Sequence, residues 1–145
     1  MRVRTFTLKD ANRLVPKISA IFDESAVIRK KILILKGELD WLREFWKDGL
    51  HDIDNPDSEK YTRIANDIEN LYSRIGRNMQ KIQAMGCMVK DMEEGLVDFY
   101  SSIGGELAFL CWRHGENEIK YWHSIEGGFR SRQPIRRMDK KVDEF

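Results

Sequence analysis

The sequence predicts an α+β protein in which a long antiparallel two-helix coiled-coil hairpin is followed by a small antiparallel β-meander of three to four strands. Two observations support this fold class. Apolar residues recur at alternating steps of three and four over most of residues 7–85, which is typical of a coiled-coil seam. After Gly86 this period stops, and short segments rich in β-branched and aromatic residues alternate with glycines, as in a sheet built from short strands.

The first helix is expected to begin at Thr7, whose hydroxyl can accept a hydrogen bond from a free backbone amide of the first turn. Asp10 then places a negative charge near the positive end of the helix. Its seam has one polar member and consists of Ala11, Leu14, Ile18, Ile21, Ser25, Ile28, Ile32, Leu35, Leu39, Leu42 and Trp46. Residues 47–57 include Gly49 and Asn55-Pro56 and are therefore predicted to form a loop.

The second helix is expected to start with Asn55 or Asp57 as its N-cap and to run to about Ala84. Its seam consists of Tyr61, Ile64, Ile68, Leu71, Ile75, Asn78, Ile82 and Met85. Antiparallel pairing of the two seams brings their polar members, Ser25 and Asn78, close together. Because an unpaired buried amide costs on the order of 1 to 3 kcal/mol, these two side chains are predicted to approach each other and fix the alignment.

A second apolar line on the first helix lies away from the seam and includes Val27, Ile34 and Trp41, with Leu33 and Phe45 beside it. A contiguous exposed apolar patch of this kind usually marks an interface. The simplest cover is a second copy of the chain, so a homodimer through the face formed by Val27, Ile34, Trp41 and Phe45 is expected. The alternative is that the loop folds back over Trp41 and Phe45.

The sheet is predicted over residues 86–126, with strands at about 87–90, 96–100, 106–113 and 119–125. If Phe99 pairs with Leu107, one face carries Val97, Phe99, Leu107, Phe109 and Cys111 and packs on the first helix. Asp98, Leu110 and Trp112 then point the other way, where Phe129 and Ile135 would cover them. A one-residue slip of register would exchange the two faces.

The chain is long enough for one domain, so residues 1–145 are expected to form a single domain. Its tail, residues 127–145, is expected to dock on the sheet at first and then to become flexible and basic. The formal net charge of +1 makes nucleic acid an unexpected partner. No apolar run suggests a membrane span or a secretory signal, and the two distant cysteines fit reduced thiols, so a cytoplasmic location is expected.

Several segments of the chain resemble a known family. They are Gly86-Cys87-Met88-Val89-Lys90-Asp91, Gly95-Leu96-Val97-Asp98-Phe99, Leu110-Cys111-Trp112-Arg113, Gly115-Glu116, Trp122-His123, Gly128-Phe129 and Arg132-Gln133-Pro134-Ile135. These segments, the opening eight residues and the helical hairpin are similar to the bacterial and archaeal family called domain of unknown function 2203. The resemblance covers nearly the whole chain and implies no established activity. The chain departs from the pattern at Tyr100, where a Pro commonly follows the Asp-Phe pair.

Four residues of these segments could form the oxygen and nitrogen ligand set of a divalent metal: Asp91, Asp98, Glu116 and His123. Of these, His123, Asp98 and Glu116 are also the candidates for catalysis. The residues predicted to bind a small ligand are Asp91, Trp112, Arg113, Trp122 and Arg132. No recognised metal-binding spacing joins these positions, so the carboxylates could equally be structural groups bonded to backbone amides or to the arginines.

Cys111 with His123 or His114, and with Asp98 to orient the base, would in principle form a nucleophilic site. The register proposed above places Cys111 on the face that packs on the helix, where a cysteine behaves as a small hydrophobic residue. A structural role is therefore expected for this thiol.

Two functions remain open from the sequence. The first is a cytosolic dimeric scaffold or protein-interaction module without evident catalysis. The second is an enzyme or binder that depends on a small ligand or a divalent metal, with its site on the sheet and the C-terminal arginine loop. In the second case the candidate side chains should converge on a cleft, whereas in the first each should be occupied by a neighbouring group.

Overall fold

The computed structural model describes residues 4–135, so the predicted basic residues Arg136, Arg137, Lys140 and Lys141 lie outside the described part of the chain. Two helices are followed by a five-stranded antiparallel sheet, which confirms the α+β class, with five strands where three to four were expected. The chain divides into two compact units. The hairpin unit is Glu24–Asn78, and the sheet unit contains the residues up to Asp23 and those from Met79 onward.

The helices are α1 (Leu8–Trp46) and α2 (Ser58–Gln83), with the short 3-10 helix η1 (Lys47–His51) after α1. Thr7 caps α1 as predicted, since its Oγ1 accepts a hydrogen bond from the Asp10 amide at 3.0 Å. None of the described helices is long and apolar enough to cross a membrane.

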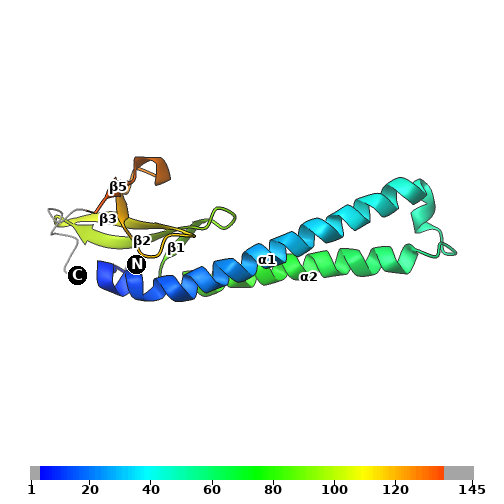
Figure 1. Cartoon of the computed structure of the whole chain (residues 1–145), viewed down its shortest axis with the longest axis horizontal. Coiled ribbons are helices and arrows are strands. Elements are labelled where there is room, and N and C mark those ends of the chain that lie inside the picture. The colour runs from blue at the N-terminus through cyan, green and yellow to red at the C-terminus, as the bar shows by residue number, and fades with distance from the viewer. Residues whose placement is uncertain (1–3, 136–145) are drawn as a thin grey trace. The chain divides into compact units, whose positions relative to one another are not determined.

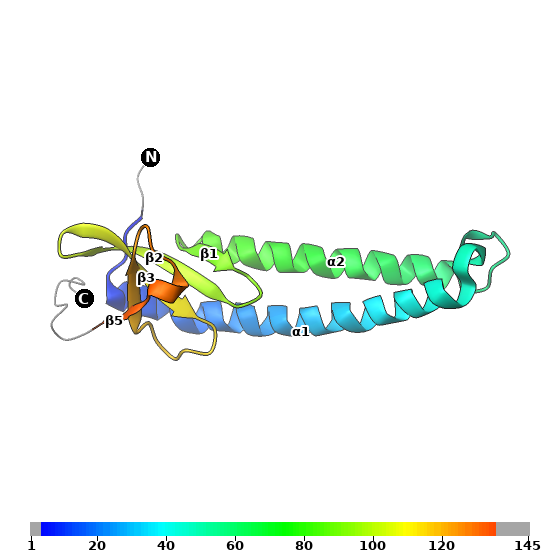
Figure 2. The ribbon, with the colours of Figure 1, turned by 90° about the horizontal axis from the view of Figure 1, so that it is seen from above.

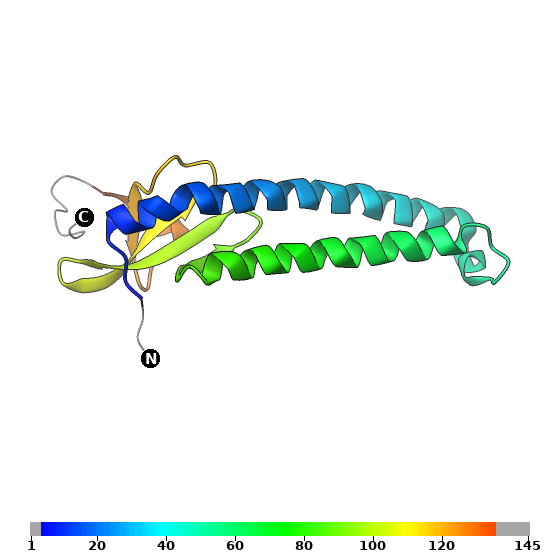
Figure 3. The same cartoon turned by 90° about the horizontal axis from the view of Figure 1, so that it is seen from below.

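In the hairpin unit, α1 and α2 run antiparallel, as Figures 2 and 3 show. Its core consists of the predicted seam residues Ile28, Ile32, Leu39, Leu42, Ile64 and Ile68, together with Leu50 of η1. Asn78 Nδ2 donates a hydrogen bond to Ser25 Oγ at 3.1 Å, and both side chains are buried. The predicted approach of these two polar seam residues is therefore confirmed, whereas supercoiling of the pair stays a prediction.

The second apolar line on α1 is exposed in the described chain. Trp41 and Phe45 stack on each other with ring centroids 5.1 Å apart, and they are 60% and 61% exposed. The loop therefore does not fold back over them. It buries Leu50 instead.

The strands of the sheet unit are β1 (Met88–Asp91), β2 (Leu96–Ile103), β3 (Glu106–Arg113), β4 (Tyr121–Ser124) and β5 (Gln133–Pro134), in that spatial order. The first turns of α1 lie along one face of the sheet (Figures 1 and 3). The 3-10 helix η2 (Phe129–Ser131) lies on the other side (Figure 1).

The register predicted for β2 and β3 is wrong. Phe99 pairs with Leu110, not with Leu107, because β2 continues to Ile103 and a two-residue turn joins it to β3. Both turn residues, Gly104 and Gly105, have positive φ values of 64° and 82°, as a tight type I′ hairpin turn requires.

This difference of three positions is odd, so it exchanges the faces of β3. Leu110 and Trp112 join Val97 and Phe99 against α1, where they pack with Val15, Ile18 and Phe22 as parts of the larger core. Leu107, Phe109 and Cys111 lie on the opposite face instead, together with Asp98.

Candidate functional site

The face of the sheet turned away from α1 carries three buried side chains that can donate to a metal. Asp98 on β2 lies directly opposite Cys111 on β3, and His123 on β4 lies opposite Phe109. A carboxylate oxygen, the thiol sulfur and an imidazole nitrogen all lie within 4.8 Å of one another. The three residues are only 3%, 1% and 2% exposed. We call them the buried trio.

The imidazole of His123 is held from both sides. Its Nδ1 lies 2.8 Å from the main-chain oxygen of Ser124. Since a carbonyl oxygen only accepts hydrogen bonds, Nδ1 carries a proton and donates it there. The other ring nitrogen, Nε2, lies 3.1 and 3.2 Å from the two carboxylate oxygens of Asp98.

The Cys111 thiol is held in its protonated form. Burial of the sulfur, and then the negative charge of Asp98, raise the pKa of Cys111 to about 12, although the Arg132 guanidinium partly opposes this. At neutral pH the free protein therefore carries a thiol and not the reactive thiolate at this position.

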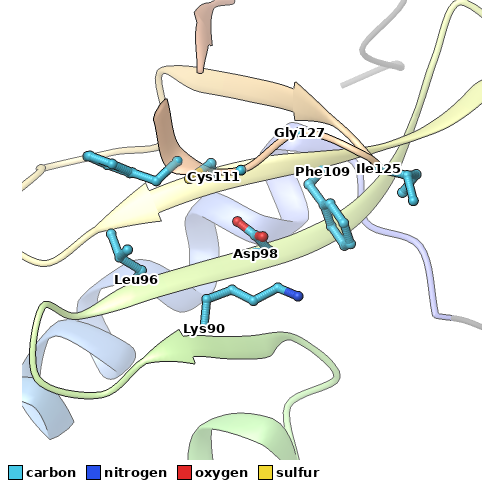
Figure 4. A pocket seen from close by; sticks show the side chains of 9 residues that line it. Lys90, Leu96, Asp98, Phe109, Cys111, Ile125 and Gly127 are labelled. Atoms are coloured by element: carbon cyan, nitrogen blue, oxygen red, sulfur yellow. The ribbon is translucent and has the colours of Figure 1, made fainter. Parts of the chain in front are cut away.

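A cavity of about 200 Å³ opens beside the trio, and Figure 4 shows the residues that line it. Asp98 and Cys111 form its polar base, and Gly127 and Gly128 border it. Its apolar walls are Leu96, Phe109, Ile125 and Phe129. The remaining lining residue is Lys90, an exposed residue whose ammonium lies 5.4 Å from the centre of the Phe109 ring.

Beside the trio, Arg132 and Glu116 form an ion pair. Arg132 Nη2 donates to Glu116 Oε2 at 2.7 Å, and the guanidinium lies over the rings of Tyr121 and Phe129. Burial lowers the pKa of Arg132. Hydrogen bonding to Glu116 and the negative charge of Glu116 outweigh this effect, so the pKa is raised overall. Glu116 Oε1 also accepts from the Arg113 amide at 2.7 Å, so this carboxylate is occupied by protein groups.

The other predicted site residues lie apart from the trio. Asp91 closes a turn, where its carboxylate accepts from the Glu94 amide at 2.8 Å. Trp112 is fully buried against α1, and its indole donates to the Glu116 main-chain oxygen at 3.0 Å. Trp122 packs against the same core, with an indole N–H that has no partner in the described chain. Arg113 forms an ion pair with Glu94 at 2.9 Å on the surface.

The sequence thus predicted Asp98 and His123 among the metal ligands, whereas the strand register expected from it placed Cys111 on the wrong face. The Gly104-Gly105 turn was the signal that could have corrected this, because a two-residue glycine hairpin fixes the register of the strands that it joins. No sequence pattern singled out the cavity residues Lys90, Phe109 and Phe129 as a group, since they come from three separate elements.

Residues 4–135 match the model of a protein family described as "Uncharacterized conserved protein (DUF2203)". No curated protein and no solved structure matches the chain.

Proposed function

Because the chain belongs to the DUF2203 family, whose description names no activity, we propose a function from the side-chain geometry alone: the buried trio binds a divalent metal ion. The observation that carries this proposal is the convergence of three different donor atoms, buried together and within 4.8 Å of one another. Thiolate, imidazole and carboxylate are all ligands of Zn²⁺, and three protein ligands with one open position are typical of catalytic zinc.

The orientation of His123 supports metal binding. A metal-bound histidine usually donates its second ring N–H to a backbone carbonyl or a carboxylate, which fixes the ring and its tautomer. The contact from Nδ1 to the Ser124 oxygen is of this kind. It leaves the lone pair of Nε2 facing the carboxylate of Asp98, an arrangement that requires a cation or a proton between them.

The same geometry argues against a nucleophilic cysteine. A catalytic thiol needs a base that takes its proton, yet both nitrogens of His123 are engaged by Ser124 and Asp98. Burial and Asp98 also keep the thiol protonated. A divalent ion would replace this proton, because a coordinating thiol is deprotonated outright by the metal.

Metal analysis of the purified full chain tests the proposal. After removal of adventitious ions, we expect one equivalent of Zn²⁺ to bind, as measured by elemental analysis and by titration against a fluorescent zinc chelator. Asp98→Asn, Cys111→Ser and His123→Gln should each weaken zinc at least about 100-fold, since loss of an outer-shell partner alone costs 10- to 100-fold. Asp91→Asn, which changes an exposed carboxylate outside the trio, should bind as the parent does.

A chain that binds neither Zn²⁺, Co²⁺ nor Mn²⁺ at micromolar concentration would refute the metal site. In that case His123 and Asp98 are a structural ion pair. Asp98→Asn should then destabilise the metal-free protein by about 3 to 5 kcal/mol, as breaking a buried pair does.

We also propose, as a second and separate function, that the hairpin unit makes the chain a homodimeric scaffold in the cytoplasm. The supporting observation is the exposed line of Val27, Ile34, Trp41 and Phe45 on α1. An antiparallel pair of α1 helices centred on Ile34 would place Val27 against Trp41 of the second copy. Two free buried cysteines fit a reducing compartment.

Charge favours this pairing as well. In the same antiparallel arrangement the exposed Lys30 of one copy faces the exposed Glu38 of the other, so opposite charges flank the apolar line twice. Trp41→Glu should weaken the dimer at least about tenfold in sedimentation, because buried tryptophans dominate interface energy. Tyr72→Glu changes an exposed ring on α2 outside this line and is the matched control. If the parent chain is still monomeric at a protein concentration on the order of 100 micromolar, the dimer is refuted.

A further inference from the structure

We propose that the cavity beside the buried trio binds a small aliphatic monocarboxylate, whose carboxylate contacts the bound metal and the Lys90 ammonium. This inference rests on the metal site proposed above and names the class of its ligand. The two features are physically joined, because Asp98 and Cys111 belong both to the trio and to the lining of the cavity. A molecule in the cavity would therefore lie against two of the three residues that would hold the metal.

The charges of the site select a monoanion. A divalent ion is neutralised by the carboxylate of Asp98 and the thiolate of Cys111, and His123 adds no charge as a neutral ligand. Arg132 and Glu116 neutralise each other in their ion pair. The charge that remains is that of Lys90, which lines the cavity. Among the described residues 4–135, none forms an ion pair with Lys90. One negative charge on the ligand would balance it.

The walls select a ligand with a hydrocarbon body. Leu96, Phe109, Ile125 and Phe129 supply four apolar side chains, which a phosphate or a sulfate would leave without apolar contacts. The volume of about 200 Å³ is below the roughly 300 to 1,000 Å³ of typical drug-sized pockets. A short aliphatic chain is therefore a better match than a nucleotide, a sugar phosphate or an aromatic cofactor.

Without metal the same cavity should reject this ligand. Its base would then offer no metal to coordinate the ligand, and a carboxylate that entered would lie against the Asp98 carboxylate, whose oxygens are already held by His123. Binding of the monocarboxylate is thus expected to require the metal, and this requirement separates the proposal from simple attraction to an exposed lysine.

The test uses the full chain loaded with Co²⁺, whose visible absorption bands change when a ligand enters the metal's coordination sphere. Acetate, butyrate and hexanoate are titrated in turn, with inorganic phosphate as the comparison. Each added methylene should tighten binding by up to about fourfold until the cavity is full, as expected for burial of a methylene group. Phosphate should bind more weakly than butyrate.

Lys90→Gln removes the ammonium but keeps an uncharged side chain of related length, and it should weaken butyrate about tenfold, as loss of a charge-assisted hydrogen bond does. Lys120→Gln changes an exposed lysine that does not line the cavity and should bind butyrate as the parent does. Both variants should bind Co²⁺ with unchanged affinity, since neither residue belongs to the trio.

The outcomes distinguish the two proposals. If no Co²⁺ binds, the metal site fails and the carboxylate site fails with it. If Co²⁺ binds and no carboxylate changes its bands, the carboxylate proposal alone is overturned. Tighter binding of phosphate than of butyrate overturns the proposed ligand class, and equal affinity for acetate, butyrate and hexanoate overturns the role of the apolar walls. Equal binding of butyrate to the metal-free chain, measured by calorimetry, overturns coordination to the metal.

Discussion

At the scale of single residues, the two cysteines of the sheet unit differ in what surrounds them. Cys111 belongs to the buried trio and lies beside Asp98, whereas the Cys87 sulfur lies 3.3 Å from the Ile82 main-chain oxygen within the apolar core. Burial raises the pKa of Cys87 to about 11, although a backbone hydrogen bond and the charge of Arg4 act in the opposite direction. Cys87 is not one of the proposed metal ligands and lies in the core that packs on α1, so its titration reports on the fold.

The raised pKa of Cys87 predicts a loss of stability at alkaline pH. Below pH 9 the thiol is protonated in both the folded and the unfolded chain, so it contributes no pH dependence. Between pH 9 and about 11 the unfolded chain releases this proton first, which favours unfolding. Denaturant titrations of the reduced protein should show the parent losing on the order of 2 kcal/mol more than Cys87→Ala over this range. Parallel pH profiles of the two proteins would contradict the prediction.

Residue chemistry alone could single out Asp98 and His123 as candidate ligands, because both are ionisable groups within otherwise apolar strands. It could not show that Asp91 and Glu116 stay apart from them. Asp91 is engaged by a turn amide, and Glu116 by an arginine sixteen residues further along the chain. Partners of this kind depend on tertiary contacts, which no local pattern encodes.

At the scale of elements, the β2–β3 turn fixes the strand register and therefore decides which side chains of β3 lie on the same face as Asp98. Gly105 has a φ of 82°, which an alanine adopts only with strain, and an added Cβ would meet no atom within 4 Å. Gly105→Ala should therefore destabilise the protein by about 1 to 2 kcal/mol through the backbone alone, as measured by chemical denaturation.

Gly128→Ala is the matched control for this substitution. An added Cβ at Gly128 also meets no atom within 4 Å, but its backbone is extended, with a φ of −132°. The control should leave stability unchanged or raise it by up to about 1 kcal/mol, because alanine restricts the unfolded chain. Equal losses for Gly105→Ala and Gly128→Ala would show that positive φ is not the reason for glycine at position 105.

The helices were easier to predict than the sheet for a physical reason. A helical seam repeats over many turns, so an error at one residue does not change which face is apolar. The Ser25–Asn78 pair followed from that repeat and is confirmed. In a strand, by contrast, every odd shift exchanges the two faces, so the error of three positions at Leu107 moved Cys111 to the opposite face.

At the scale of the whole molecule, each helix contributes residues to both compact units. The divisions fall between Asp23 and Glu24 in α1 and between Asn78 and Met79 in α2. Both lie within two residues of Ser25 or Asn78, whose buried side chains are joined by a hydrogen bond. The sequence predicted one helical hairpin over residues 7–85 and a sheet that packs on the first helix. It did not locate the two division points, because the apolar repeat continues across them. The expectation that residues 1–145 fold as one domain stays a prediction.

The contact that orients His123 has a consequence for any genetic survey of this molecule. Its acceptor is the main-chain oxygen of Ser124, which every amino acid would supply equally. Exchange of the Ser124 side chain leaves that oxygen in place, so a complete scan of single substitutions would identify the three donors and overlook the group that aims one of them. This part of the site therefore depends on the path of the backbone and not on the residue type at position 124.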